Sequence, residues 1–80
     1  PSLESLLPAL FQSAEGVDHL LVVQTMKGGA QTVAAGIDWE EWHEVLGTLA
    51  GDDTILIILR KPEFLPAVQA RLEQMARPLH

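Results

Sequence analysis

The chain has 80 residues, of which 48% are hydrophobic and 20% charged, and this balance predicts one small globular domain rather than two domains or a disordered segment. It contains no cysteine, which excludes disulfide bonds and thiolate zinc sites. The 11 acidic and 5 basic residues give a formal net charge of −6, which excludes a surface built to bind nucleic-acid phosphates.

The first elements predicted along the chain are two strands that form a hairpin. Leu20 to Thr25 begins with a short, β-branched apolar block that is typical of a buried strand. We expect Leu6 to Ser13 to pair with it through a turn at Gly16 and Asp18. Pro8 would limit the first strand to a sheet edge, and its leucines also fit a helical period, so a helix remains the alternative there.

An amphipathic helix is predicted after the glycine pair Gly28-Gly29. Apolar residues fall there at i, i+3, i+4 and i+7, namely Ala30, Val33, Ala34 and Ile37. Gly36 weakens the helix near its end. A tight strand-to-helix turn is the simplest role for the glycine pair, because no phosphate-binding glycine motif surrounds it.

Two strands and a second helix complete the predicted order. Val45 to Ala50 and Thr54 to Leu59 are apolar enough for buried strands, and only Gly51-Asp52-Asp53 separates them. Pro62 or Pro66 fits the first turn of the last helix. That helix has one apolar face, made of Phe64, Leu65, Val68, Leu72 and Met75. The order is β-β-α-β-β-α, and residues 1–80 form a single unit without repeat or linker.

Few residues suit covalent or metal chemistry. There is neither a G-x-S-x-G elbow nor a cysteine, so enzymes with an activated nucleophile are disfavoured. The histidines His19, His43 and His80 are too scattered for a metal site, and the first two are expected at the surface or at an interface.

Two acidic segments carry more information. Asp52 and Asp53 are adjacent carboxylates with no basic residue nearby, so a bound cation would relieve their repulsion, although acidic residues are also common in turns. Trp39 and Trp42 flank Glu40-Glu41, and the simplest expectation is that both tryptophans anchor an acidic loop to the core. The sequence does not fix the role of this loop.

Two sequence motifs then indicate a family. The stretch Gly47 to Thr54 reads GTLAGDDT and is followed at once by an apolar strand. Upstream, Gly28-Gly29-Ala30-Gln31 opens the predicted helix, and Asp38 stands seven residues after Gln31. The chain resembles the C-terminal domain of bacterial arginine repressors over nearly its whole length. Lys27 departs from the proline that usually precedes the glycines of that family.

The resemblance implies an α+β, two-layer fold with a four-stranded antiparallel sheet and two helices on one face. It also implies a homo-oligomer, in which trimers stack into a hexamer around L-arginine as co-repressor ligand, with no cofactor. Asp52 and Asp53 correspond to residues that bind the guanidinium, partly from the opposite trimer. The ligand's α-amino and α-carboxylate groups are held at positions that correspond to Gln31, Asp38, Thr48 and Ala50.

The expected function is therefore effector binding and oligomerisation in an arginine-responsive transcriptional regulator, not catalysis. The family's winged helix-turn-helix domain, which contacts operator DNA, is absent from this chain, and the start at Pro1 suggests a fragment. No apolar run approaches the ~18–20 residues of a membrane span, so a cytoplasmic location without a membrane partner is expected. Two alternatives stay open: a small enzyme of the pterin carbinolamine dehydratase type, and a generic amino-acid-binding regulatory module.

Overall fold

A computed structural model describes residues 2–78 of the chain. In chain order these residues form α1 (Leu3–Leu10), β1 (Phe11–Val17), β2 (Leu20–Thr25), α2 (Ala30–Glu40), β3 (Val45–Ala50), β4 (Thr54–Leu59), a 3₁₀ turn (Pro62–Phe64) and α3 (Leu65–Ala76). Pro1, at the start of the chain, and His80, one of the three scattered histidines, lie outside the described residues.

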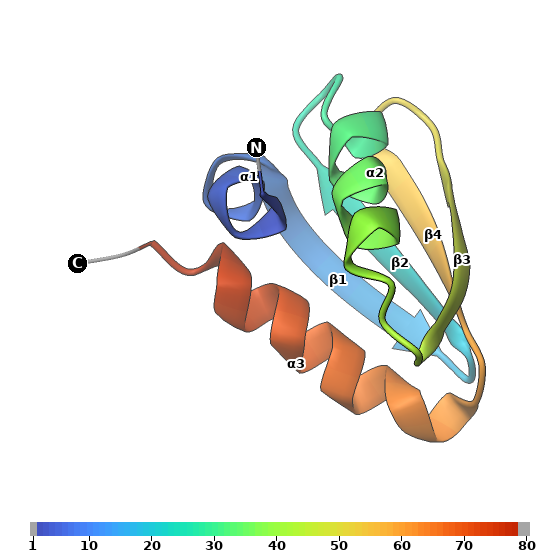
Figure 1. The fold of residues 1–80 in the computed structure, drawn as a ribbon. Helices are drawn as coiled ribbons and strands as arrows, with labels where there is room; N and C mark the ends of the chain where they lie inside the picture. Colours follow the sequence, from blue (N-terminus) through green and yellow to red (C-terminus); the bar gives the residue numbers. More distant parts are fainter. Residues whose placement is uncertain (1, 79–80) are drawn as a thin grey trace.

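The four strands form one antiparallel sheet in the order β1-β2-β4-β3, and the helices cover one of its faces (Figure 1). Strand residues alternate between the two faces, so every second side chain of β2 and β4 meets the helices. The core contains the buried aliphatic side chains Leu21, Val23, Ile55, Ile57 and Leu59 of the sheet and Leu3, Leu7, Val33, Ile37, Val68 and Leu72 of the helices. The predicted α+β two-layer fold is confirmed.

The prediction of a strand over Leu6 to Ser13 is wrong, because a helix occupies most of that range. The Ser2 side chain caps α1 by accepting from the backbone N–H of Ser5, at 3.3 Å. Leu3 and Leu7, four residues apart, lie on the same side of the helix and are fully buried. Burying these two side chains outweighs the backbone hydrogen bond that Pro8 cannot donate inside the helix.

The rest of the predicted order is confirmed, and an additional helix precedes it. The hairpin turns at Asp18, which has a positive φ of 55°, and β1 begins only at Phe11. Helix α2 extends three residues beyond the predicted stripe, so Asp38 lies in its last turn. Within residues 2–78 the sheet is therefore covered by three α-helices instead of the two expected.

The second face of the sheet is not covered by any part of residues 2–78. We call it the open sheet face and define it by its apolar side chains Val17, Leu20, Val22, Leu49, Leu56 and Ile58. Val17 and Leu49 are 63% and 66% exposed. The strand registers place one charged side chain, Glu15, on the same face. A contiguous apolar surface of this kind is typical of an association surface.

Candidate functional site

Four of the predicted site residues lie together where α2 passes the edge strand β3. The Gln31 side chain donates from Nε2 to the backbone carbonyl of Ala50, at 3.1 Å. Near the other end of the helix, the Thr48 hydroxyl donates to Asp38 Oδ1, at 2.9 Å. Gln31 and Asp38 are seven residues apart, which is nearly two helical turns, so both side chains project from the same side of α2.

The register of β3 explains why its residues meet this side of the helix. Thr48 and Ala50 pair with Ile57 and Ile55, whose side chains point into the core, so both face the helical layer. The intervening Leu49 points to the open sheet face. Alternation along β3 therefore directs Thr48 and Ala50 toward α2 and Leu49 toward the open sheet face.

These residues retain hydrogen-bonding capacity. A carboxylate has about four acceptor positions, and the Thr48 hydroxyl uses one of those on Asp38. The Gln31 amide has two N–H donors, and Ala50 accepts one of them. The side chains of Gln31 and Asp38 are both exposed. Gln31 could therefore bind an anionic group of a small molecule at this edge, and Asp38 could bind a cationic group of the same molecule.

Two hollows open next to the two ends of this set. A groove between α1 and α2 is lined by Leu6, Gln31 and Trp39, among other residues. A smaller hollow of about 280 Å³ lies between the end of α2 and β3, and Asp38 and Arg60 line it. The side chains of Gln31 and Asp38 are thus both accessible from the surface.

The predicted acidic pair lies on the turn between β3 and β4, above the start of α2. The backbone carbonyl of Asp52 accepts from the Ala30 N–H at 3.1 Å, and that of Asp53 accepts from the Thr25 N–H at 2.8 Å. The Thr54 hydroxyl donates to Asp53 Oδ1 at 2.9 Å. These bonds fix the turn against both the helix and the central strand β2.

The acidic pair is not joined to the rest of the predicted set within one chain. Among residues 2–78, no hydrogen bond or ion pair links the carboxylate of Asp52 or Asp53 to Gln31, Asp38 or Thr48. Asp52 is exposed and Asp53 is half-buried. The two carboxylates concentrate negative charge on one turn without a basic side chain of the described region to balance it.

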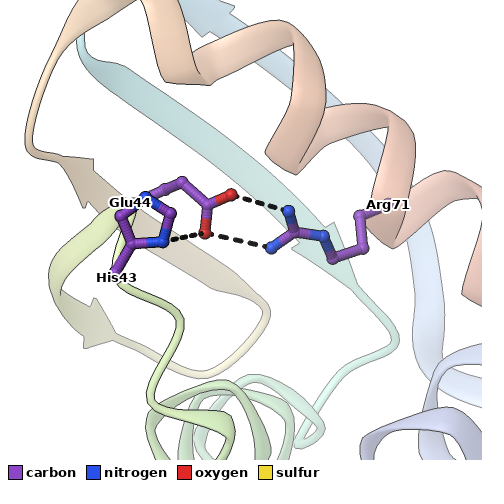
Figure 2. Close-up of polar contacts among 3 residues, drawn as sticks. All are labelled: His43, Glu44 and Arg71. Atoms are coloured by element: carbon purple, nitrogen blue, oxygen red, sulfur yellow. Dashed lines mark hydrogen bonds and ion pairs between the residues drawn. The ribbon is translucent and has the colours of Figure 1, made fainter.

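A bidentate ion pair fixes the segment between α2 and β3. Arg71 of α3 donates to both carboxylate oxygens of Glu44, at 2.7 and 3.2 Å, and the guanidinium lies 4.6 Å from the centre of the Trp42 ring. Figure 2 shows Glu44 between Arg71 and His43, whose Nδ1 is 3.6 Å from the carboxylate. Hydrogen bonds from Arg71 lower the pKa of Glu44 from 4.5 to about 2, although burial acts in the opposite direction.

The sequence did not predict this ion pair, because its partners are 27 residues apart and nothing local links them. The prediction that two tryptophans anchor the loop is half correct. Trp42 packs against the core, whereas Trp39 is 85% exposed on the last turn of α2. A helix that continues to Glu40 turns Trp39 away from the sheet, and this extension was not expected.

Neither a cluster of metal ligands nor a membrane-spanning helix is found among residues 2–78. Residues 2–78 contain no group of three or more His, Asp or Glu side chains that could hold a metal ion. His43 is 80% exposed and its ring packs edge-on against Phe64, as expected for a surface histidine. None of the described helices combines the length and apolar character that crossing a bilayer requires.

Comparison with known proteins gives a consistent result. The family model described as "Arginine repressor, C-terminal domain" matches residues 7–74. An arginine repressor of Bacillus velezensis is 46% identical over 65 residues, which cover 81% of this chain and 44% of that protein. An arginine repressor of Staphylococcus aureus is 45% identical over 62 residues, or 78% of this chain and 41% of that protein. The chain thus spans less than half the length of these relatives.

Proposed function

Because this chain belongs to the arginine repressor family, as its C-terminal domain, we propose that it binds L-arginine and associates with copies of itself within an arginine-responsive regulator. The family consists of transcriptional regulators, so the chain is not an enzyme. Membership of this family sets aside both alternatives, the small enzyme of the dehydratase type and the generic amino-acid-binding regulatory module. One observation carries the proposal. The hydrogen-bonded pairs Gln31–Ala50 and Asp38–Thr48 lie on α2 and β3, and the turn that follows β3 carries two carboxylates without a basic partner among residues 2–78.

The α-amino and α-carboxylate groups of the ligand are assigned to α2 and β3. Asp38, oriented by its hydrogen bond from Thr48, accepts from the ammonium group. Gln31 donates its second amide N–H to the carboxylate, while its contact with the Ala50 carbonyl holds the side chain in place. Both contacts are made within one chain and already orient the two side chains, so the binding residues lose little conformational freedom on binding.

The guanidinium is assigned to the turn of Asp52 and Asp53. A guanidinium presents five N–H donors in a planar fork, which matches paired carboxylates with charge-assisted bonds. The positive charge also relieves the repulsion between the two adjacent carboxylates. Since no hydrogen bond or ion pair joins the carboxylates of this turn to Asp38 within residues 2–78, we propose that one ligand bridges the α2 edge of one copy and the acidic turn of another.

The open sheet face is the proposed surface between copies in a trimer. The side chains that define it are aliphatic, and Gln24 and Thr54 lie on the same face near the acidic turn. Glu15 is the single charge that the strand registers place there, so two copies can meet despite the net charge of −6. A chain of this size buries only about 60–65% of its unfolded surface alone, and association covers exposed apolar area such as that of Val17 and Leu49. Two such trimers, stacked through the acidic turns, give the proposed hexamer.

DNA contact is assigned to a part of the regulator that this chain does not include. The net charge of −6 opposes binding to phosphates, and the relatives extend well beyond the matched region. A winged helix-turn-helix domain that contacts operator DNA, and a cytoplasmic location, belong to the same proposal. Arginine would then act on DNA binding by changing the assembly that orients those domains.

Calorimetric titration of the chain with L-arginine and L-citrulline tests the ligand. Citrulline keeps the shape of arginine but lacks its charge, and leaving carboxylates without their cation costs about 2 kcal/mol or more. We expect L-arginine to bind at least about thirtyfold more tightly. Equal affinity for the two amino acids would refute the role of the acidic turn.

A titration with agmatine tests the assignment at the other end of the ligand. Agmatine has the guanidinium but no α-carboxylate, so we expect it to bind weakly to the parent chain. Gln31→Ala and Asp38→Ala should weaken binding of L-arginine and of L-citrulline together, since both share the α groups. Tight binding of agmatine would mean that these two residues are wrongly assigned.

A further inference from the structure

A short chain of polar contacts leads from the centre of the sheet to the acidic turn. Gln24 of β2 and Thr54 of β4 are directly paired in the antiparallel register. The Thr54 hydroxyl lies 3.2 Å from Gln24 Oε1 and 2.9 Å from Asp53 Oδ1. Their strand neighbours Val23 and Ile55 point into the core, so Gln24 and Thr54 lie on the opposite side of the sheet.

The number of available protons sets the direction of hydrogen-bond donation along these three residues. A hydroxyl group has one proton, and an ionised carboxylate can only accept, so the Thr54 proton goes to Asp53. The hydroxyl oxygen can still accept a hydrogen bond. If the Gln24 amide turns by 180°, its NH₂ group takes the place of Oε1 and donates to that oxygen. All three groups are then satisfied, with donation running from Gln24 through Thr54 to Asp53.

The backbone and side chain that hold the Thr54 hydroxyl in place have little conformational freedom. Thr54 is β-branched, which restricts its χ1 angle, and it begins a strand that is paired on both sides. The backbone of the turn is held as well, because the Asp53 carbonyl accepts from Thr25 and Gly51 donates to the Thr54 carbonyl, at 2.8 and 2.9 Å. The backbone of Asp53 is therefore fixed, and only its side chain can still rotate. The hydrogen bond from the Thr54 hydroxyl sets the orientation of that carboxylate.

We propose that Thr54, supported by Gln24, is a positioning residue that orients the Asp53 carboxylate toward a guanidinium. This inference rests on the proposed function, because it concerns the same ligand. The hydroxyl uses one acceptor position of Oδ1, so three of about four remain on the carboxylate. Two parallel N–H groups of a guanidinium need one position on each oxygen, and the contact with Thr54 leaves both available.

The expected effect is a loss of charge recognition rather than a general loss of binding. Thr54→Val keeps the shape and the strand preference of the side chain but removes the hydroxyl. The Asp53 carboxylate must then be immobilised by the ligand itself, which lowers affinity for L-arginine by about three- to tenfold. L-citrulline has no charge to place against Asp53, so its affinity should change by less than about twofold, within the range that ordinary surface substitutions cause.

The experiment is a calorimetric comparison of L-arginine and L-citrulline on the parent chain and its variants. Thr54→Val and Thr54→Ala should both lower the preference for arginine, and agreement between them removes any dependence on the packing of one replacement. Thr54→Ser, which restores the hydroxyl, should regain the parent preference. Sedimentation of each variant checks that the state of association is the same.

Thr25→Val is the matched control. It removes a hydroxyl that donates to the Met26 carbonyl at 2.9 Å, next to the same turn, but keeps the backbone N–H that holds Asp53. We expect it to reduce stability without changing the preference for arginine over citrulline. An unchanged preference in Thr54→Val, or an equal loss of both ligands, would overturn the positioning role and leave the proposed function standing. A parent chain without any preference would overturn both.

Discussion

Glu44 has the most strongly shifted carboxyl group among the described residues. Arg71 lowers its pKa from 4.5 to about 2, through two hydrogen bonds at 2.7 and 3.2 Å. A pKa that is lower in the folded state contributes stability above the unfolded pKa and loses it as the pH falls toward the folded pKa. The ion pair therefore stabilises the fold fully at neutral pH, and its contribution declines between pH 4.5 and about 2.

Replacing this carboxylate should change both the stability and its pH dependence. Glu44→Gln is expected to lower the free energy of unfolding at pH 7 by about 1–2 kcal/mol, the typical value of a charge-assisted contact with a partly exposed partner. Its stability should also fall less steeply than that of the parent below pH 4.5. Urea unfolding between pH 2 and 7 measures both, with the exposed Glu41→Gln as control. Parallel curves for parent and Glu44→Gln would contradict the assignment.

Individual site residues were predictable to different degrees. Gln31, Asp38, Thr48 and Ala50 came from a family motif, and the structure brings them into two hydrogen-bonded pairs. Contacts between distant residues were not predictable: Arg71 reaches Glu44 across 27 residues, and no local pattern selects that partner. The roles assigned to the acidic turn remain predictions for the titrations described above.

At the level of elements, α1 depends on tertiary packing. An eight-residue helix with an internal proline would not be stable alone, since isolated helices shorter than ~12–15 residues are marginal in water. Leu3 and Leu7 are buried against the core, and Gly36 of α2 allows the close approach, because a Cβ there would lie 3.3 Å from Leu3 Cδ1. The apolar residues between Leu6 and Ser13 fit both a strand and a helix, and the packing that selects the helix involves residues distant in the sequence, so local propensity does not decide between them.

A pair of substitutions in α1 tests that explanation. Leu7 is fully buried and its neighbour Leu6 only half-buried, so the same Leu→Ala change separates packing from helix propensity. Leu7→Ala should destabilise the fold by about 2–4 kcal/mol, and Leu6→Ala by about 1 kcal/mol or less. Urea or thermal unfolding measures the difference. Equal losses for the two variants would mean that α1 does not depend on its buried stripe.

The elements whose predictions were confirmed carry a strong pattern of their own. Thr54–Leu59 has aliphatic side chains on both faces, and the structure uses one set in the core and the other on the open sheet face. Helix α2 buries the predicted stripe of Ala30, Val33, Ala34 and Ile37. In both cases the period of apolar residues matches the geometry of the element, so local and tertiary preferences agree.

At the scale of the whole molecule, the open sheet face is the main apolar surface that a single chain leaves exposed. Leu49 lies on it, is 66% exposed, and pairs with Leu56 of the central strand β4. Leu49→Lys should weaken association by at least about tenfold, since it removes apolar burial and places a charge in the contact. The isolated fold should tolerate it, because Leu49 does not reach the core.

Sedimentation velocity across protein concentration measures that effect. Ala70→Lys introduces the same charge at an exposed position of α3, away from the sheet, and should leave association unchanged. Circular dichroism confirms that both variants are folded. If Leu49→Lys associates as strongly as the parent chain, the copies meet through another surface.

The central claim is that L-arginine bridges copies of this domain, and sedimentation equilibrium with and without the ligand tests it most directly. In the proposed hexamer the acidic turns of stacked trimers would repel one another without ligand, and a bound guanidinium would neutralise them. Saturating L-arginine should therefore shift the mass distribution from trimer to hexamer, while L-citrulline at the same concentration should not. An identical mass distribution with and without saturating L-arginine would contradict the account.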